Sequence, residues 1–307
     1  MRVLAHVHTF NDADIIDRTI EAIRRQTRPV DGIIVVDNAS TDGTLERPAL
    51  KAVTVLRHHE NSGTSGTVVT GLEFALEQGY DWAWIFDADS VPERDALEKL
   101  LGLYESLPQS EKDETAFLAS LASGLQDDTP FHGQVMVGNG VEVVRPSPTQ
   151  RYYPCHITIW SGCLYRMEAV RRIGLPNADY VLDWGDFEYG YRVMKAGYKG
   201  FIDQESKLKH NVRGHASLVP FEIRFGPLRH KFYDFPPIRC YYKCRNMLYF
   251  ALYDVAGSRT VLVGRVAWRV FKMTLNFLLR PRNHGAQIAA CFRGIWHGVT
   301  GNVAARY

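Results

Sequence analysis

The sequence lacks most features of a secreted or membrane-spanning protein. Its five cysteines are odd in number and form neither a C-x-x-C pair nor a Cys/His spacing typical of zinc sites. No run of about 20 uncharged apolar residues is present, which argues against a transmembrane helix. The first residues lead directly into a strand pattern and show no signal-peptide architecture. We therefore expect reduced, mostly buried thiols and a cytoplasmic location.

Acidic residues are scarce in the last third of the chain. Residues 1–204 contain 19 Lys and Arg against 30 Asp and Glu, whereas residues 205–307 contain 17 against 4. The resulting charges of −11 and +13 account for the net charge of +2. A basic tail on an acidic body indicates that the tail faces lipid headgroups or nucleic acid. Because no nucleic-acid-binding motif is present, we expect no nucleic-acid partner.

The common phosphate-binding loops are also absent. The glycine-rich residues 61–66 (NSGTSG) match neither G-x-G-x-x-G nor the Walker pattern with its lysine. Two interpretations of this loop stay open. It is either a plain strand-to-helix turn or a turn whose backbone N–H groups bind phosphate at the start of the next helix.

The first hundred residues alternate between predicted strands and predicted helices. Such alternation indicates a parallel α/β sheet covered on both faces, in which ligands bind beyond the carboxyl ends of the strands. We expect a further helix to begin after the acidic turn at 37–43, with Ser40 or Thr41 as its N-cap. The strands are expected at 2–8, 32–36, 53–56 and 82–87, the helices at 13–26, 67–78 and 94–106, and the polar loops at 9–12, 37–42, 61–66 and 87–90.

The alternation weakens after residue 106. Trp160 has two open interpretations, a core position or a platform for a sugar ring. Asp183 has two as well, a functional role or a simple partner of a helix dipole. We expect a loop at 107–115, strands at 116–121, 134–144, 157–164 and 199–203, and helices at 167–173 and 183–196.

The apolar strand at 82–87 ends in two carboxylates that lie one residue apart, Asp87 and Asp89. Residues i and i+2 of a strand point to the same side, so both carboxylates can converge on one point. Two carboxylates together with phosphate oxygens suit a hard divalent cation such as Mn²⁺ or Mg²⁺. The alternative is a solvated strand end without a ligand.

Taken in order, the motifs resemble those of inverting family 2 glycosyltransferases with the GT-A fold. The resemblance covers about residues 1–210. It implies a Rossmann-like α/β catalytic domain at 1–215, with a mixed, mainly parallel sheet and helices on both faces. A basic, amphipathic helical extension follows at 216–307. The motifs are 9–11 (TFN), 35–43 (VVDNASTDG), 61–63 (NSG), 87–89 (DAD) and 183–188 (DWGDFE).

The resemblance implies a role for each motif. The implied nucleotide-sugar contacts are Thr9, Asn11, Asp37, Asn61, Gly63, Asp87 and Ala88. Asp87 and Asp89 would bind the metal ion together with His210, and Asp186 would be the general base. The implied acceptor contacts are Trp160, Asp183, Trp184 and Glu188.

The implied reaction is metal-dependent, inverting sugar transfer from a UDP- or dTDP-linked donor to a glycan or lipid-linked glycan in cell-surface polysaccharide synthesis. Residues 239–246 (RCYYKCRN) resemble an R-x-Y-Y-x-x-R-N stretch of the rhamnosyl- and galactofuranosyltransferase branch, so rhamnose or galactofuranose is favoured. A nucleotidyltransferase is one alternative, although residues 9–12 lack the basic phosphate-binding signature that it would need. A non-catalytic nucleotide-sugar-binding protein is the other.

The tail contains two predicted amphipathic helices, at 258–279 and 286–297. Arg265, Arg269 and Lys272 share one helical face, and apolar side chains occupy the rest. This pattern is typical of helices that lie in a membrane interface. We therefore expect peripheral contact with the inner face of the cell membrane through 258–297. The alternatives are packing against the enzyme body or against a second copy in a homo-oligomer.

Overall fold

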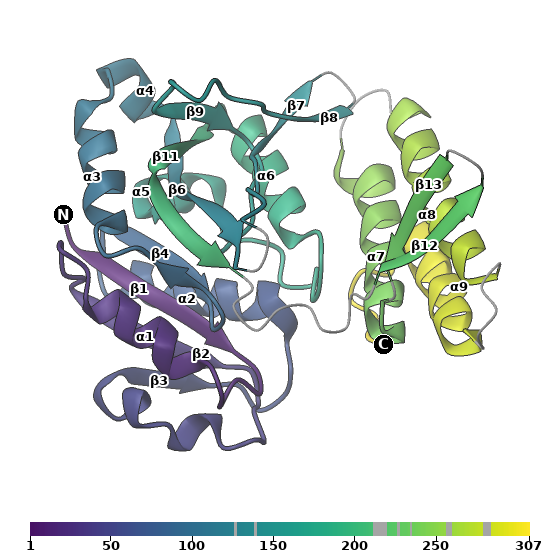
Figure 1. The fold of residues 1–307 in the computed structure, drawn as a ribbon, viewed down its shortest axis with the longest axis horizontal. Coiled ribbons are helices and arrows are strands. Elements are labelled where there is room, and N and C mark those ends of the chain that lie inside the picture. The colour runs from purple at the N-terminus through teal and green to yellow at the C-terminus, as the bar shows by residue number, and fades with distance from the viewer. Residues whose placement is uncertain are drawn as a thin grey trace. The chain divides into compact units, whose positions relative to one another are not determined.

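The computed structural model forms two compact units (Figure 1). The second unit contains the short segment Asp179–Trp184, although the residues on both sides of it belong to the first. Residues 258–259 and 279–283 of the predicted membrane segment lie outside the described residues. The structure describes residues 1–125, 128–137, 140–210, 220–225, 228–233, 235–255, 260–278 and 284–307. The first unit is Met1–Ala178 with Gly185–Gly214, and the second is Asp179–Trp184 with His215–Tyr307.

The described part of the first unit is built around a mixed sheet of nine strands. Its strands are β1 (Val3–Thr9), β2 (Gly32–Asp37), β3 (Thr54–Arg57), β4 (Trp82–Asp87), β5 (Val91–Pro92), β6 (Thr115–Gly124), β9 (Tyr152–Cys155), β10 (Cys163–Arg166) and β11 (Lys199–His210). The order is β3-β2-β1-β4-β10-β6-β11-β5, and β9 also pairs with β11. The strands β1 to β4 are parallel, and β10 is antiparallel to both β4 and β6. Because β11 is parallel to β6, it runs in the same direction as β4.

Helices cover both faces of this sheet because alternate side chains of its strands point to opposite sides. Trp84 and Phe86 of β4 belong to one hydrophobic cluster, and Ala83 and Ile85 belong to the other. The first cluster includes side chains of two helices, α1 (Ile16–Arg24) and α3 (Ala96–Ser106). The second includes side chains of α2 (Gly63–Glu77), α5 (Met167–Ile173) and α6 (Gly185–Lys195).

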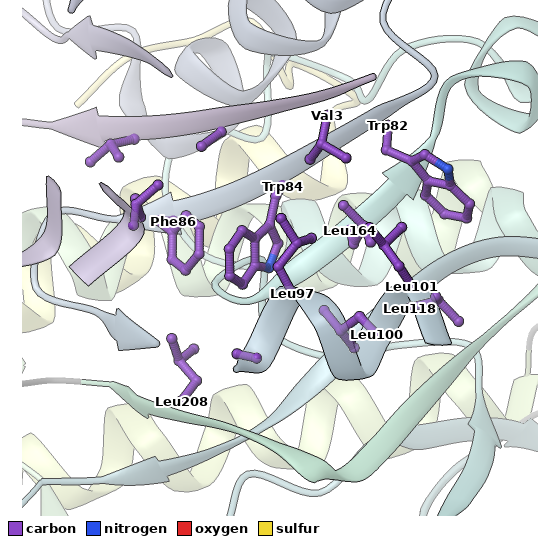
Figure 2. Packing of buried hydrophobic residues seen from close by; sticks show 14 of the residues in the cluster. Val3, Trp82, Trp84, Phe86, Leu97, Leu100, Leu101, Leu118, Leu164 and Leu208 are labelled. Atoms are coloured by element: carbon purple, nitrogen blue, oxygen red, sulfur yellow. The ribbon is translucent and has the colours of Figure 1, made fainter. Parts of the chain in front are cut away.

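Large side chains of β4 stabilise the first cluster. Figure 2 shows Trp84 packed beside Leu97 of α3, with Leu164 of β10 nearby. Burying each side chain of this size contributes about 1.5–3 kcal/mol relative to an exposed position. The strand that ends at Asp87 is therefore anchored on a rigid scaffold.

The predicted α/β fold is confirmed, with corrections to individual elements. The helix expected after 37–43 is wrong: two short 3₁₀ turns, Thr44–Glu46 and Pro48–Ala52, occupy this place. The hydroxyl of Ser40 caps no helix there, because it accepts a hydrogen bond from the Asn11 N–H at 2.9 Å. The strand expected at 157–164 begins only at Cys163, since Gly162 adopts a left-handed conformation with φ of 84°.

Further differences lie outside the central strands. The loop expected at 107–115 contains a short helix, α4 (Gln109–Asp113). The strand expected at 134–144 is a hairpin of β7 (Gln134–Val137) and β8 (Gly140–Val143). The strand expected to end at residue 203 continues to His210.

In its described residues, the second unit contains three α-helices and a hairpin. These are α7 (Pro237–Tyr249), α8 (Thr260–Leu278), α9 (Gly285–Val299), and the hairpin of β12 (Pro220–Phe225) with β13 (Leu228–Tyr233). A π-helical turn, Phe250–Asp254, follows α7. Helices α7 and α9 pack so closely that a Cβ at Gly294 would lie 2.4 Å from the carbonyl oxygen of Tyr241.

Two sequence predictions concern the whole chain. All five cysteines are free and buried, as predicted. Among the described residues, none of the helices combines the length and the apolar character that crossing a bilayer requires.

Candidate active site

The strand directions bring the predicted functional loops to one edge of the sheet. In the parallel register of β1 with its neighbours, Thr9 lies beside Asp37 and His8 lies beside Asp87. Strand β11 runs in the same direction and ends at His210. The two-residue strand β5 pairs with the end of β11, which draws His210 toward the residues that follow β4.

Asp87, Asp89 and His210 come together at this edge. The Nδ1 atom of His210 lies 3.8 Å from Asp89 Oδ1 and 3.9 Å from Asp87 Oδ2. The same nitrogen forms a hydrogen bond of 2.7 Å with the hydroxyl of Ser90. Residues 120 positions apart in the sequence therefore share one polar cluster.

The pKa values of Asp87 and Asp89 shift in opposite directions, because Asp87 forms a hydrogen bond with the buried His8. His8 Nε2 lies 2.7 Å from Asp87 Oδ1. Burial would raise the pKa of Asp87, but the charge and the hydrogen bond of His8 outweigh it and lower the pKa. For His8, burial lowers the pKa, and Asp87 outweighs it to give a raised value. Burial, followed by the charge of Asp87, raises the pKa of Asp89 to about 6.

The donor types in this cluster fit a divalent cation. Carboxylate oxygens and an imidazole nitrogen, completed by phosphate oxygens, are ligands that Mn²⁺ accepts, and Mg²⁺ accepts the oxygens. Within the described residues, no three His, Cys, Asp or Glu side chains already surround a single metal position. The donor atoms are therefore close but not preassembled, and the ligand set Asp87, Asp89 and His210 stays a prediction.

A chain of hydroxyl groups supports the cluster and was missed from the sequence. Ser161 Oγ accepts a hydrogen bond of 3.0 Å from the Asp87 N–H and donates one of 2.7 Å to Ser90 Oγ. Ser90 in turn contacts His210. The available signals were polar residues in or after apolar runs. These are His8, which follows residues 3–7, and Ser161, which interrupts the apolar run 157–164.

The loops after β1 and β2 are tied together by the residues predicted to hold the nucleotide. Asn11 Oδ1 accepts a hydrogen bond of 2.8 Å from the Thr41 N–H. Thr9 Oγ1 donates one of 2.9 Å to Asp12. Asn11 and Ala39 adopt left-handed conformations, with φ of 57° and 66°. Such strain in non-glycine residues is concentrated at functional sites.

The remaining predicted nucleotide contacts have partners within the same edge. Asp37 is fully buried, accepts hydrogen bonds of 3.2 and 3.3 Å from the Ser40 N–H, and lies 3.6 Å from Arg57. Asn61 Oδ1 accepts the N–H of Gly63 at 2.9 Å, so this N–H at the start of α2 already has an acceptor. The carbonyl of buried Ala88 accepts a hydrogen bond of 2.6 Å from Thr19. Nucleotide binding by these residues stays a prediction.

The predicted base, Asp186, lies in the first turn of α6. Its Oδ1 accepts a hydrogen bond of 3.0 Å from the Phe187 N–H. Burial, followed by electrostatic interactions with Cys155 and Asp186, raises the pKa of Cys163. The rings of Tyr189 in α6 and Tyr165 in β10 lie 5.7 Å apart, so α6 packs beside β10, the strand that pairs with β4. The role of Asp186 as the base stays a prediction.

The predicted acceptor contacts are largely engaged elsewhere. Glu188 is buried, with Oε1 2.5 Å from Arg192 Nε and Oε2 accepting the Asn177 N–H at 3.1 Å. Asp183 belongs to the second unit and forms ion pairs there.

Trp160 was predicted to be either a core residue or a platform for a sugar ring, and the structure shows it packed in the core. It is 7% exposed and stacks on Tyr189 at a centroid distance of 5.8 Å. Acceptor binding by Trp160, Asp183, Trp184 and Glu188 stays a prediction.

A doubly covered α/β sheet in which a carboxylate pair follows a central strand is typical of nucleotide-sugar-binding transferases. Residues 5–110 match the model described as Glycosyl transferase family 2. The match lies within the first unit and covers about a third of the chain, so this part of the chain is similar to that family. The chain has the GT-A fold.

Two curated relatives extend the similarity beyond the family model. "Galactofuranosyltransferase GlfT1" of Mycobacterium tuberculosis is 26% identical over 207 residues, which are 64% of this chain and 65% of that protein. "dTDP-rhamnosyl transferase RfbF" of Shigella flexneri is 23% identical over 217 residues, 70% of this chain and 68% of that protein. The match thus spans slightly less than two thirds of the GlfT1 length.

A solved structure supports the fold over nearly the whole chain. The mannosyltransferase PcManGT from Pyrobaculum calidifontis, in complex with GDP-Man and Mn²⁺, aligns with a TM-score of 0.54 and 15% identity. The alignment covers 97% of this chain and 86% of that chain. At this identity the likeness concerns the fold alone.

Proposed function

We propose that this protein transfers a sugar, with inversion at the anomeric carbon, from a nucleoside-diphosphate sugar to a glycan acceptor, and that the transfer requires a divalent cation. The observation that carries the proposal is the approach of His210 to both carboxylates of the Asp87–Asp89 pair at the carboxyl edge of a GT-A sheet. The presence of Mn²⁺ and GDP-Man in the complex of PcManGT supports it.

Asp87, Asp89 and His210 would hold the cation, which when bound supplies the positive charge that stabilises a departing diphosphate. His8 keeps Asp87 ionised and orients it through the 2.7 Å contact. Ser161 and Ser90 form hydrogen bonds that connect the Asp87 backbone with the His210 ring and so limit the movement of both. His8, Ser161 and Ser90 would thus hold the metal-binding side chains in the orientation that diphosphate binding requires.

Asp186 would accept the proton of the attacking acceptor hydroxyl. Inverting transfer is a single displacement, so it needs a base on the acceptor side and stabilisation of the leaving group on the other. Asp186 stands at the start of α6, a helix that packs beside β10. Its position in the 183–188 motif supports this role.

The favoured sugars are rhamnose and galactofuranose, linked to dTDP or UDP. The names of the two curated relatives support this choice. The proposed acceptor is a glycan or a lipid-linked glycan of cell-surface polysaccharide synthesis. The similarity of residues 5–110 to the Glycosyl transferase family 2 model favours this function over the nucleotidyltransferase and the non-catalytic binding protein.

The test is release of nucleoside diphosphate from a panel of UDP- and dTDP-sugars with Mn²⁺, with and without acceptor glycans. We expect turnover with at least one donor, its loss in EDTA, and its loss in Asp87→Asn. The matched control is Asp113→Asn, an exposed carboxylate on α4 that should retain full activity. Full turnover in EDTA would remove the metal from the mechanism, and no turnover with any donor would contradict the transferase function.

A second element of the proposal concerns the helices α8 and α9, for which we infer contact with an anionic membrane surface. Four large aromatic side chains on these helices are more than half exposed: Trp268 (58%), Phe271 (52%), Phe292 (58%) and Trp296 (67%). Soluble surfaces rarely expose aromatic residues in such density, and amphipathic aromatic rings prefer the headgroup level of a bilayer.

The positive charge of α8 and α9 favours anionic lipid as the binding partner of this surface. Arg265, Arg269 and Lys272 of α8 are exposed, and no Asp or Glu follows Asp254 in the sequence. A groove of about 470 Å³ between the helices is lined almost entirely by apolar side chains, among them Val270, Phe271, Leu278, Phe292 and Ile295. Apolar surface bordered by cations complements anionic lipid. This contact would hold the enzyme on the inner face of the cell membrane.

Flotation with phosphatidylglycerol-containing vesicles tests this element. We expect the protein to float with anionic vesicles at low salt and to remain at the bottom with neutral ones. Failure to float at low salt, combined with a dimer in light scattering, would assign the surface to a second copy instead.

A further inference from the structure

One face of α7 carries polar side chains that all contact the same short segment. Arg239, Lys243 and Asn246 are spaced four and three residues apart, so they share one helical face. They belong to residues 239–246 (RCYYKCRN), for which the proposed reaction provides no role. Their common target is Asp179–Trp184, the only part of the chain before residue 185 that lies in the second unit.

Two cations of α7 bind one carboxylate of this segment. Arg239 Nε lies 3.1 Å from Asp183 Oδ2, and Arg239 Nη2 lies 3.2 Å from Oδ1. Lys243 Nζ lies 3.0 Å from Asp183 Oδ1. The Asp183 side chain is only 11% exposed, which strengthens both ion pairs relative to a surface pair. Burial would raise the pKa of Asp183, but Lys243 and Arg239 outweigh it and lower the pKa.

The backbone of the segment is held as well. Asn246 Nδ2 donates hydrogen bonds of 3.0 Å to the Leu182 carbonyl and 2.8 Å to the Asp183 carbonyl. Buried Arg245 donates from Nε to Asn246 Oδ1 at 2.8 Å, which fixes the direction of the amide. Arg245 also donates to the carbonyl of Asp179. Helix α7 therefore holds the segment at both of its ends.

The held segment has a strained conformation. Asp183 and Trp184 have φ of 61° and 71°, so two consecutive non-glycine residues are left-handed. Such residues persist only where the surrounding structure determines their conformation. The contacts from α7 provide this constraint. The next residue is Gly185, where α6 begins, and Asp186 follows it.

We propose that Arg239, Lys243 and Asn246 are positioning residues, which hold the Asp183–Trp184 turn and thereby set the position of Asp186 at the start of α6. The part of this proposal that concerns catalysis rests on the proposed function of Asp186. The part that concerns the turn does not. A displacement of about 1 Å at a catalytic group can cost about 10²-fold in rate, so loosening the turn should act on turnover.

The kinetic experiment compares Arg239→Gln, Lys243→Met and Asn246→Ala with Ile238→Ala in the full chain. Ile238 is an exposed residue of the same helix and serves as the matched control. We expect kcat to fall about tenfold to about 100-fold in the first three variants, at unchanged affinity for UDP or dTDP with Mn²⁺. Ile238→Ala should retain wild-type kcat. A loss of kcat that only follows the folded fraction, measured by circular dichroism, would overturn the proposal.

A double-mutant cycle tests whether Arg239 acts through Asp183. In an Asp183→Asn background, Arg239→Gln should lower kcat less than about twofold further, because its partner charge is already gone. Arg239→Lys keeps a charge near Asp183 and should give an intermediate kcat. Equal losses in both backgrounds would contradict an action through Asp183.

Amide hydrogen exchange tests the turn without any enzymatic activity. We expect faster exchange at residues 183–187 in Asn246→Ala than in the wild type, while exchange in β4 stays unchanged. Unchanged exchange at 183–187 would overturn the held turn. If the wild type transfers no sugar, the proposed function fails, whereas the exchange result still decides the structural part.

Discussion

The two units of the molecule differ in their charge and in the large aromatic side chains that they expose. The first unit is acidic and buries polar groups such as His8, Asp37 and Glu188 beside the carboxyl edge of its sheet or in the first turn of a helix. The second is basic and exposes large aromatic residues, Trp268 and Trp296. Buried polar groups and exposed apolar groups are both costly, and both mark function more reliably than the average surface does. Under the proposed function, the first unit would carry the chemistry and the second would carry the surface attachment.

The largest expected effect separates the two units by their chemistry. Asp186→Asn should lower kcat by about 10²–10⁴-fold, because the amide cannot accept the proton of the acceptor hydroxyl. Binding of the nucleotide with Mn²⁺ should survive, as should vesicle flotation. Turnover assays and calorimetry measure the two quantities on the same preparation. Wild-type turnover in this variant would remove Asp186 from the role of base.

Two tryptophans, one buried in the first unit and one exposed in the second, should contribute differently to the free energy of unfolding. Trp84→Ala should lower the free energy of unfolding by about 3–5 kcal/mol, because Trp84 is 0% exposed in the core of the first unit. Trp268→Ala should change it by only about 0.5 kcal/mol, since Trp268 is 58% exposed on α8. Denaturant titration provides both values. Equal destabilisation would show that other parts of the protein bury Trp268. This would contradict the membrane contact, which requires Trp268 to be exposed in the absence of lipid.

Charge removal in α8 measures the attachment. Replacing Arg265 and Arg269 together by Gln should weaken binding to anionic vesicles by about 30-fold, because each cation near an anionic surface contributes about 1 kcal/mol. Turnover with a soluble acceptor should stay unchanged, so attachment and chemistry separate. Unchanged flotation of this variant at physiological salt would contradict an electrostatic contact.

The pH dependence of metal binding sharpens the chemistry of the first unit. Because the pKa of Asp89 is raised to about 6, this carboxyl is protonated below that pH and must lose its proton to bind a cation. The affinity for Mn²⁺ should therefore be highest well above pH 6 and should fall about tenfold for each pH unit below 6. Titration of Mn²⁺ at several pH values tests this. An affinity that is constant between pH 7 and pH 5 would exclude Asp89 as a ligand.

The sheet of the first unit was predictable because its strands carry strong local patterns. The apolar run before Asp87 and the polar loops after each strand were sufficient to indicate one functional edge. The two-residue strand β5 was not predictable, since so short an element has no period. For the same reason, no local pattern indicated that His210 would meet Asp87 through the pairing of β5 with β11.

The partners of the site residues were even less accessible from the sequence. His8 contacts Asp87 from 79 positions away, and Asp183 meets Arg239 from 56 positions away. Such contacts depend on tertiary packing and leave no periodic signal. The left-handed pair Asp183–Trp184 was equally hidden, because neither residue is a glycine.

The most direct test of the central claim is calorimetric titration of UDP and dTDP, with and without Mn²⁺, into the wild type and into Asp89→Asn. The metal site at the end of β4 predicts that Mn²⁺ tightens nucleotide binding to the wild type at pH 7.5 and that Asp89→Asn abolishes this enhancement. An equal enhancement in Asp89→Asn would place the cation elsewhere and contradict the assignment of Asp87, Asp89 and His210.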